Sequence, residues 1–560
     1  MASKHSLQLL EMLIFLISFL ALAKLALMAD CVPENFNRTY FPDDFIFGTA
    51  TSAYQIEGAA NISGKGPSVW DTFTHEYPER IKDHSTGDVA VDFYHRYKED
   101  IQNVKSMGFN AFRFSISWPR VIPSGRRREG VNEEGIKFYN SVINETINQG
   151  LQPFVTIFHW DTPQALEDKY RGFLSRNIVE DYRDYADLLF EKFGDRVKFW
   201  MTFNEPWSLS GFSYDDGVFA PGRCSSWVNR QCRAGNSATE PYIVAHHLLL
   251  AHSAAVQLYR GKYKETQNGQ IGITIFTFWF EPLSNRAEDI EASKTALDFM
   301  FGLWMDPLTY GRYPRIVRDL AGDRLLNFTE EETHLLRGSY DFLGLQYYTS
   351  YYAKPNAPVD SDHIRSSYYA KPNAPVDSDH IRYKTDSHIT ETPYDYDGNL
   401  IGPQAYSSWF YIFPKGIRHL LNYTKDTYND PVIYITENGV DNLNTEIDKA
   451  GEENITAALK DEFRIDYYRK HMWNALGSLK DYHVNLKGYF AWSYLDNFEW
   501  NIGYTSRFGL YYVDYHNNLT RIRKNSADFF EKFLNPLNTS ENIAQITSEY
   551  SRKIGKFYVM

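Results

Sequence analysis

The chain has 560 residues and a formal net charge of −13 at pH 7, which disfavours nucleic acid as a partner. Hydrophobic residues make up 43% and charged residues 23% of the sequence, close to the values of globular proteins, which excludes a wholly disordered chain, a collagen-like chain and a membrane protein with many spans. Aromatic residues reach 16%, a share that fits either a large aromatic core or rings that stack on sugars.

The first 29 residues are expected to form a secretory signal peptide. A lysine precedes an apolar run over residues 12–22, and Ala23 and Ala29 offer two positions after which a signal peptidase can cleave. The run has about half the residues of a membrane span, and Lys24 interrupts it, so no permanent membrane anchor is expected. The sequence therefore predicts a protein of the secretory pathway and leaves the vacuole, the apoplast and a storage body open as its final compartment.

Cysteine and asparagine patterns agree with an oxidising, secretory environment. Cys224 and Cys232 lie eight positions apart, whereas Cys31 has no near neighbour, so Cys224–Cys232 is the expected disulfide. This spacing without a Cys or His cluster argues against zinc. Asn-x-Ser/Thr glycosylation sites occur at Asn37, Asn61, Asn144, Asn327, Asn422, Asn454, Asn518 and Asn538.

Short apolar strands and amphipathic helices alternate along the chain. Strands are predicted at residues 45–54, 111–118, 153–160, 198–204, 270–280, 341–348, 432–436 and 486–492. Helices are predicted at residues 88–107, 136–150, 178–193, 240–264, 289–304, 414–428, 459–483 and 525–534.

Eight strands, each followed by a helix, predict an α/β protein built as a single (β/α)8 TIM barrel with long βα loops. The barrel is expected to cover residues 40–535 and to be followed by a C-terminal tail over residues 536–560. An open doubly wound sheet is the structural alternative. It is disfavoured because the first strand is not followed by a glycine-rich phosphate loop and low-complexity linkers do not divide the chain.

One segment interrupts this regular alternation. Residues 349–365 are repeated as residues 366–382, and the copies differ only at Thr349 and Ser366. Because solenoid repeats are more numerous and diverge, a single copy of 17 residues is interpreted as a recent duplication or a gene-model artefact. We expect it to lengthen the loop after the sixth strand, since the free-energy cost of closing a loop grows only slowly with loop length.

The reacting groups of a parallel barrel project from the carboxyl ends of its strands. The polar and aromatic residues at these ends are Gln55, Glu57, Arg113, His159, Asp161, Asn204, Glu205, Glu281, Tyr348, Glu437, Glu499 and Trp500. Carboxylates dominate the set, and it contains no Ser-His-Asp, Cys-His, phosphate-loop or metal-helix pattern. The residue types favour chemistry by paired carboxylates, as in glycoside hydrolysis, and predict neither a metal nor a cofactor.

The residues by themselves do not select the reacting pair. Six carboxylates lie at or near strand ends, and any one of them is more often solvated or salt-bridged than catalytic. In the same way, His159 alone is more often a core histidine, and Trp492 and Trp500 are more often core filling.

Two motifs supply the missing information. Asn-Glu-Pro at residues 204–206 and Ile-Thr-Glu-Asn-Gly at residues 435–439 resemble the two signatures of glycoside hydrolase family 1. The blocks at residues 45–57 and 491–500 are similar to that family too, so the resemblance covers about residues 40–535. The signal peptide and the cysteine loop resemble the secreted plant β-glucosidases that act on defence glucosides, cyanogenic ones among them.

The resemblance implies a retaining O-β-glucosidase that acts on a small-molecule glucoside. Glu437 is implied as the nucleophile, Glu205 as general acid and then base, and Arg113 and Tyr348 as the groups that hold Glu437 ionised and aligned. The glucose-binding set implied is Gln55, His159, Asn204, Trp492, Glu499 and Trp500, and Trp409 and Phe508 are implied for an apolar wall of the aglycone pocket. Two residues depart from the family pattern: Gln346 replaces a usual Asn, and Tyr494 replaces a usual Leu.

Other functions stay open at this point. A transglucosidase would hand the same glucosyl group to another alcohol, and a hydrolase of disaccharide glycosides would use the same site. A catalytically silent sugar-binding barrel, spoiled by the duplication, is an alternative of a different class, against which the presence of both Glu205 and Glu437 argues. The oligomeric state is not indicated by the sequence.

Overall fold

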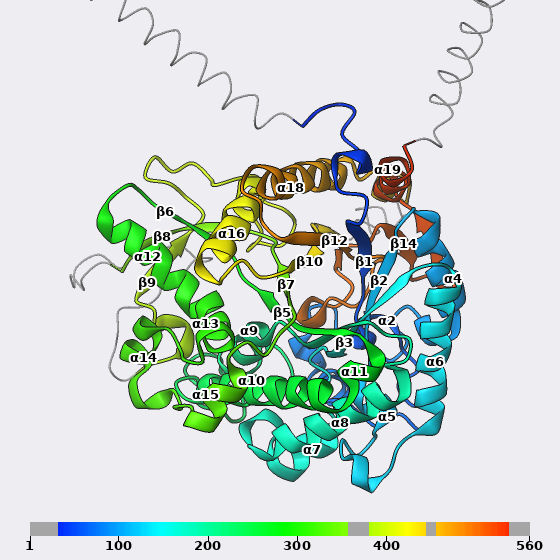
Figure 1. Ribbon diagram of the computed structural model, residues 1–560, viewed down its shortest axis with the longest axis horizontal. Coiled ribbons are helices and arrows are strands. Elements are labelled where there is room, and N and C mark those ends of the chain that lie inside the picture. The colour runs from blue at the N-terminus through cyan, green and yellow to red at the C-terminus, as the bar shows by residue number, and fades with distance from the viewer. Residues whose placement is uncertain (1–31, 357–379, 444–454, 537–560) are drawn as a thin grey trace, which may run out of the picture.

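Eight parallel strands close into a barrel, and helices form a layer around it (Figure 1). The computed structural model describes residues 32–356, 380–443 and 455–536. The barrel strands are β1 (Ile46–Ala50), β2 (Ala111–Ser115), β3 (Gln152–Phe158), β4 (Phe199–Asn204), β5 (Gln270–Phe276), β7 (Phe342–Gln346), β10 (Ile433–Asn438) and β12 (Leu486–Trp492). They follow one another in sequence around the barrel, and β12 pairs with β1 to close it. The predicted (β/α)8 barrel is confirmed.

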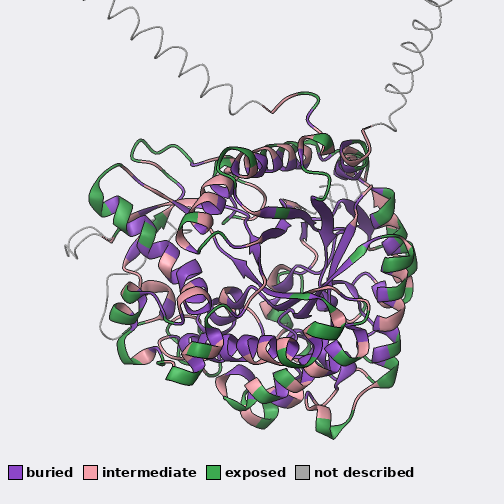
Figure 2. Ribbon diagram, viewed as in Figure 1, coloured by how far each residue is buried: buried purple, intermediate pink, exposed green. Residues whose placement is uncertain are grey.

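Helices cover the barrel with their apolar faces, because parallel strands must be buried on both sides. The helices of eight or more residues are α3 (Val69–Glu76), α4 (Phe93–Ser106), α6 (Glu133–Asn148), α8 (Asn177–Phe193), α10 (Glu240–Leu258), α12 (Ala287–Leu297), α13 (Leu303–Tyr310), α16 (Pro414–Thr427), α18 (Glu462–Asp481) and α19 (Asn525–Leu534). Figure 2 shows the barrel strands mostly buried and most of the surrounding helices buried on one side and exposed on the other.

Shorter helices connect these elements. They are α2 (Ala53–Ile56), α5 (Trp118–Val121), α7 (Gln164–Tyr170), α9 (Pro206–Ser208), α11 (Lys264–Gln267), α14 (Arg315–Ala321), α15 (Glu330–Leu336) and α17 (Ile455–Leu459). Outside the barrel, β6 (Trp279–Pro282), β8 (Ser350–Pro355) and β9 (Ile389–Thr392) form a three-stranded sheet, and two two-stranded sheets pair β11 (Asn442–Leu443) with β13 (Ser506–Arg507) and β14 (Tyr511–Asp514) with β15 (Thr520–Arg523).

The barrel interior is a packed core. Seven of its strands each contribute one buried side chain to a single cluster, namely Ile46, Ala111, Phe154, Met201, Phe342, Tyr434 and Phe490. Strand β5 carries Gly272 beside this cluster, where an added Cβ would lie 2.9 Å from the ring of Phe342. The cluster therefore leaves the carboxyl ends of the strands as the place for a cavity.

Several predicted boundaries are wrong, for local reasons. The first helix was expected from residue 88, but α4 begins at Phe93, because Ala90 and Asp92 have left-handed φ angles of 47° and 57°. The first strand ends at Ala50, and part of its predicted length is the short helix α2. The predicted strand over residues 270–280 is divided between β5 of the barrel and β6, which leaves the barrel to pair with β8.

Several predictions fall largely outside the described residues. The signal peptide, Cys31, Asn454, Asn538, the tail from residue 537 and residues 357–379 of the duplication lie there. Residues 350–355 of the first copy form β8, a strand of the small sheet rather than the expected loop, and the second copy ends at Arg382. Among the described helices, none combines the length and the apolar character needed to cross a bilayer.

Candidate active site

Glu205 and Glu437 lie at the carboxyl ends of two barrel strands and line the same cavity of about 840 Å³. Glu205 directly follows β4, and Glu437 is the fifth residue of β10. Both are almost completely buried, with 7% and 3% of their surfaces exposed. Two carboxylates 232 positions apart, the pair that the family resemblance implied, thus line one cavity.

Both carboxylate oxygens of Glu437 accept hydrogen bonds. Arg113 Nη1 donates to Oε1, and Tyr348 Oη donates to Oε2 over 2.7 Å. Arg113 is fully buried on β2, and its second amino group, Nη2, donates to Asn204 Oδ1 over 2.7 Å. Gly439, two residues after Glu437, leaves room for the Trp492 carbonyl oxygen, which would lie 1.8 Å from an added Cβ.

Glu205 has a different environment. Its backbone is in the left-handed region, with φ 41°, its amide donates to Thr274 O over 3.0 Å, and Ser208 Oγ donates to its Oε2 over 2.7 Å. Burial raises the pKa of Glu205 well above its ordinary value, and the negative charge of Glu437 raises it further. Arg113 and the bond from Ser208 act in the opposite direction but do not reverse the shift.

Burial also raises the pKa of Glu437, but this shift is opposed by the charge of Arg113 and by the hydrogen bonds from Tyr348 and Arg113. The two carboxyls therefore differ in their donors, and Glu437 is the one that ionises first. A second negative charge in the same buried cavity is unfavourable, which favours the protonated form of Glu205 while Glu437 is ionised.

The residues predicted to bind glucose surround this pair. Asn204 Nδ2 lies 3.1 Å from His159 Nε2, and the rings of Trp492 and Trp500 are nearly parallel to the His159 ring, with centroids 6.2 Å and 5.8 Å away. Burial lowers the pKa of His159 well below its ordinary value, so the imidazole is neutral. Among the described residues, His159 Nδ1 and Glu499 Oε1 have no hydrogen-bond partner, which leaves them for a bound hydroxyl group.

Two predicted site residues do not line the cavity. Gln55 is fully buried behind Glu499, to whose Oε2 its Nε2 donates over 3.4 Å, and Arg113 lies behind Glu437. The predicted residues that line the cavity are His159, Asn204, Glu205, Tyr348, Trp409, Glu437, Trp492, Glu499, Trp500 and Phe508. Gln55 and Arg113 are therefore placed to orient the groups that face a ligand.

The structure separates the remaining strand-end carboxylates from this site. Glu57 is held by Arg120, at 2.8 Å, and by Tyr139, at 2.6 Å. Glu281 accepts from Trp279 Nε1 over 2.8 Å, and its Oε1 lies 2.6 Å from His419. Neither of these two nor the buried Asp161 lines the cavity, so the six candidates reduce to Glu205, Glu437 and Glu499.

The outer part of the cavity is largely aromatic. Trp409, 40% exposed, stacks on Phe278 with centroids 6.2 Å apart, and Tyr351 Oη donates to the Trp409 carbonyl oxygen. Sequence reasoning missed the lining residues Trp207, Phe212, Phe278, Phe299, Tyr351 and Lys384. Trp207 directly follows the Asn-Glu-Pro motif and could have been found there. The others carry no motif: Phe212 and Phe299 lie in short π-helical segments, Lys384 in a 3-10 helix, Tyr351 in β8 and Phe278 between β5 and β6.

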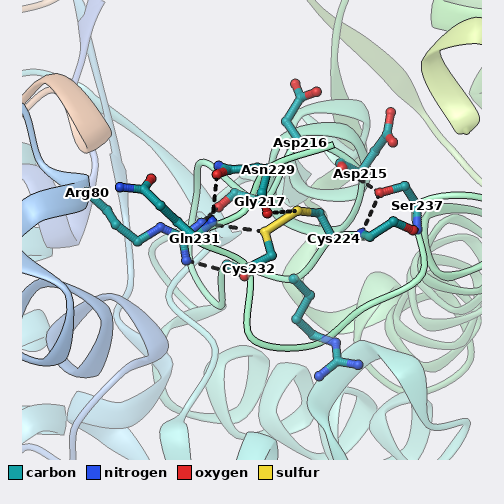
Figure 3. Close-up of a disulfide and its surroundings, with 12 residues drawn as sticks. Arg80, Asp215, Asp216, Gly217, Cys224, Asn229, Gln231, Cys232 and Ser237 are labelled. Carbon is teal, nitrogen blue, oxygen red and sulfur yellow. Dashed lines mark hydrogen bonds between the residues drawn. A yellow bond between two sulfur atoms is a disulfide. The ribbon is translucent and has the colours of Figure 1, made fainter. Parts of the chain in front are cut away.

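A disulfide joins Cys224 and Cys232, the pair expected from the sequence (Figure 3). It packs against Gly217, where an added Cβ would lie 2.2 Å from Cys232 Sγ, and Arg80 donates to the Gly217 carbonyl oxygen.

The neighbouring acidic residues connect this loop to the cavity. Asp215 accepts from Arg382 Nε over 2.9 Å, and Asp216 pairs with Arg382 and with the cavity-lining Lys384. The disulfide loop thus supports one rim of the cavity.

Among the described residues, no group of three or more His, Cys, Asp or Glu side chains could hold a metal ion. The site instead combines two buried carboxylates of unequal proton affinity with fixed donors, acceptors and aromatic faces at the carboxyl end of a (β/α)8 barrel. This combination defines a glycoside hydrolase.

Comparisons with known proteins define the family. The family model "Glycosyl hydrolase family 1" matches residues 37–538. Beta-glucosidase 12 of rice is 52% identical over 498 residues, which cover 89% of this chain and 93% of the relative, and raucaffricine-O-beta-D-glucosidase of Rauvolfia serpentina is 50% identical over 511 residues, covering 88% and 90%.

Solved structures agree. A rice β-glucosidase mutant in a covalent complex with glucose has a TM-score of 0.84 at 46% identity and covers 89% of this chain and 99% of its own. A β-glucosidase of the fungus Humicola insolens in complex with glucose has a TM-score of 0.81 at 39% identity, with coverages of 90% and 98%. The chain belongs to glycosyl hydrolase family 1. Its activity is that of a β-glucosidase, the hydrolysis of O-glycosyl compounds.

Proposed function

We propose that the enzyme hydrolyses β-D-glucosides of plant specialised metabolites with an apolar aglycone through a glucosyl-enzyme intermediate, with Glu437 as nucleophile and Glu205 as acid and then base. The observation that carries this assignment is the difference between the two carboxyls. Glu437 accepts bonds from Arg113 and Tyr348, whereas burial and the charge of Glu437 raise the pKa of Glu205.

Each step follows from this difference in charge. Glu205 donates its proton to the leaving aglycone oxygen while the Glu437 carboxylate attacks the anomeric carbon. The glucosyl ester that forms no longer carries the negative charge of Glu437, so the pKa of Glu205 falls and its carboxylate can accept a proton from the incoming water. Attack of that water on the anomeric carbon releases glucose with its configuration retained and restores both groups.

The aromatic outer cavity supports an apolar aglycone. Trp409, Phe278 and Phe508 offer ring faces beside the inner, polar region in which glucose would bind. The printed names of relatives such as raucaffricine-O-beta-D-glucosidase and furostanol glycoside 26-O-beta-glucosidase support a glucoside of a specialised metabolite as substrate.

We also propose a secretory destination in the vacuole, the apoplast or a storage body. The disulfide supports an oxidising compartment. Asn61, Asn327 and Asn518 are exposed, as attachment of a glycan requires. Mass spectrometry of the protein from its source would locate the mature N-terminus and the glycans. An N-terminus that retains residues 1–23 would contradict this destination.

The test of the catalytic assignment is trapping with a 2-deoxy-2-fluoro-β-glucoside that carries an activated leaving group. The fluorine slows hydrolysis of the glucosyl ester, so peptide mass spectrometry should find the sugar on Glu437. A label on another residue would overturn the assignment. Products from natural glucosides and one diglycoside, each with and without an added alcohol acceptor, then separate hydrolysis, transglucosylation and disaccharide release.

The catalytically silent alternative depends on the duplication and has its own test. Deleting residues 366–382 leaves Arg365 directly before Tyr383, the position that Arg382 now holds in its pair with Asp215. This arginine would then lie nine positions after Asn356, a reach of up to roughly 30 Å. We expect kcat/KM to stay within about twofold, because loop closure depends weakly on length. A silent full-length chain that becomes active on deletion would favour the alternative.

A further inference from the structure

Gln346 is a buried amide at the end of β7 that does not line the cavity but reaches a side chain that does. Its Nε2 donates to Asn204 Oδ1 over 2.9 Å. Strand β5 lies between β7 and β4 in the barrel, so the Gln346 side chain passes β5 to reach the end of β4. In backbone register Gln346 also stands opposite Glu437 of β10. Gln346 therefore contacts the end of the strand that precedes Glu205 and lies beside the strand that carries Glu437.

This contact determines how the Asn204 amide is oriented. Asn204 Oδ1 accepts from two buried donors, Arg113 Nη2 at 2.7 Å and Gln346 Nε2 at 2.9 Å. An amide oxygen has two acceptor positions, so both are occupied by donors. The opposite end of the amide, Nδ2, is then fixed as the group that lies 3.1 Å from His159 Nε2.

The orientation of Asn204 in turn selects the tautomer of His159. Asn204 Nδ2 can only donate, so His159 Nε2 accepts. Burial keeps this imidazole neutral, and a neutral imidazole that accepts at Nε2 carries its proton at Nδ1. His159 Nδ1 is the nitrogen that lacks a partner among the described residues, so it is left as a donor for a ligand oxygen.

Arg113 holds two side chains at the carboxyl ends of barrel strands, Glu437 and Asn204, and Gln346 also holds the second of them. Arg113 also donates to Glu437 through Nη1 and to Thr156 Oγ1 through Nε over 3.2 Å. If Arg113 alone held Asn204, any movement of the guanidinium with Glu437 would also turn the Asn204 amide. Gln346 provides a second anchor for Asn204 from a different strand.

We propose that Gln346 is a positioning residue for sugar binding, which fixes the Asn204 amide and, through it, the proton-donating face of His159. The inference rests on the proposed function, because it assigns Asn204 and His159 to glucose hydroxyls. It goes beyond that function because it names the residue that determines which atoms of Asn204 and His159 donate hydrogen bonds and which accept them.

The test uses Gln346→Met, which keeps the length and approximate volume of the side chain and removes the amide. Gln267→Met is the matched control. Gln267 also donates one bond, to Phe190 O over 2.8 Å, and has a buried Oε1 without a partner among the described residues, but it lies at the end of α11 and does not line the cavity. The melting temperature of each variant registers any general loss of stability.

Steady-state kinetics on a 4-nitrophenyl glucoside and its 2-, 3-, 4- and 6-deoxy analogues give the first readout. We expect Gln346→Met to lower kcat/KM about tenfold on the parent glucoside, the loss of one buried hydrogen bond. On the analogue that lacks the hydroxyl bound by Asn204 or His159, the loss should shrink to about twofold or less. Gln267→Met should stay near wild type on all of them.

An equal loss on every analogue would overturn the proposal, since a merely structural role does not distinguish hydroxyl groups. A shift in the acid limb of the pH profile would also overturn it, because Gln346 would then act through Arg113 on the ionisation of Glu437. Unchanged kinetics on the parent glucoside would count against it as well.

A second readout does not depend on activity. Imidazole ¹⁵N NMR, with the His159 signals assigned by their loss in His159→Gln, should show the proton on Nδ1 in the wild type and a mixture of tautomers in Gln346→Met. A wild-type proton on Nε2, or the same tautomer in both proteins, would overturn the proposal. Failure of the trapping experiment on Glu437 would instead concern the proposed function and leave this measurement interpretable.

Discussion

The inner and outer parts of the cavity are built in different ways. In the inner part, side chains such as Glu437, Asn204 and His159 come from a barrel strand or directly follow one, and buried hydrogen bonds join them, as Arg113 does between Glu437 and Asn204. In the outer part, Trp409 lies in a loop and Phe278 lies between β5 and the small sheet, and they meet mainly through ring contacts.

This difference assigns different tasks to the two parts. Buried polar groups on rigid strands keep a fixed geometry and unequal proton affinities, which bond cleavage at one kind of sugar requires. Aromatic side chains on loops offer area without strict direction, which suits a variable aglycone. Mutations in the inner part should therefore affect turnover of every substrate, and mutations in the outer part should affect only some.

The largest effect is expected for Glu437→Gln. Without the carboxylate nucleophile, kcat should fall at least ~10⁴-fold on every glucoside. Glu281→Gln is the matched control, because Glu281 is a partly buried strand-end carboxylate that does not line the cavity. Kinetics on an aryl and an alkyl glucoside would check this, and substantial activity of Glu437→Gln would contradict the role of Glu437 as nucleophile for every substrate.

Glu205→Gln should have an effect that depends on the leaving group. An alkyl aglycone needs the proton from Glu205, so kcat/KM should fall by ~10²–10⁴-fold, whereas an activated phenol departs without it and the formation of the glucosyl ester should change little. Burst kinetics with the activated phenyl glucoside separate ester formation from its hydrolysis. Equal losses in ester formation on both kinds of substrate would contradict the different roles of the two glutamates.

Trp409→Ala tests the outer part. Removal of one aromatic wall should lower kcat/KM about tenfold for a glucoside with an aromatic aglycone and should leave methyl glucoside nearly unchanged. Trp227→Ala is the control, since Trp227 is 41% exposed, as Trp409 is 40% exposed, but does not line the cavity. A similar loss on methyl glucoside would show that the two parts of the cavity are not independent.

The smallest expected effect is a shift in pH dependence. The hydrogen bond from Ser208 stabilises the ionised form of Glu205 and lowers its pKa, so Ser208→Ala should raise that pKa. Because the first step needs protonated Glu205, kcat/KM falls as pH rises through this pKa, and the alkaline limb should move to higher pH in the variant. A shift to lower pH, measured on an alkyl glucoside, would contradict the assignment of that limb to Glu205.

The two parts of the cavity also differ in how far the sequence revealed them. Residues such as Glu205, Glu437 and Trp492 lie in or next to barrel strands, whose apolar runs and motifs are local signals. Phe278 was expected inside a barrel strand, but the chain leaves the barrel after Phe276, and β6 pairs with β8 about 70 positions later in the sequence. Pairing at such a separation has no local signal, so the contribution of Phe278 to the wall was not predicted, although the family resemblance implied Trp409 and Phe508.

Strand-end position did not distinguish the catalytic carboxylates from the others; the family motifs and the contacts of each carboxylate did. Glu57 and Glu281 were equal candidates to Glu205 by strand-end position, but they pair with Arg120 and His419 and do not line the cavity. The predicted helix from residue 88 failed for a related reason, because left-handed φ angles at Ala90 and Asp92 depend on contacts that the helical pattern does not contain.

The alternation of strands and helices, the family motifs and the residue types available for chemistry could be predicted from the amino-acid sequence alone, because these depend on side-chain periodicity and on short stretches of chain. The closed barrel sets which carboxylates share a cavity, which of the two has its pKa raised further and which way the Asn204 amide points. Those properties depend on burial and on donors from strands that are distant in the chain, and desolvation and hydrogen bonding act only once the barrel has closed.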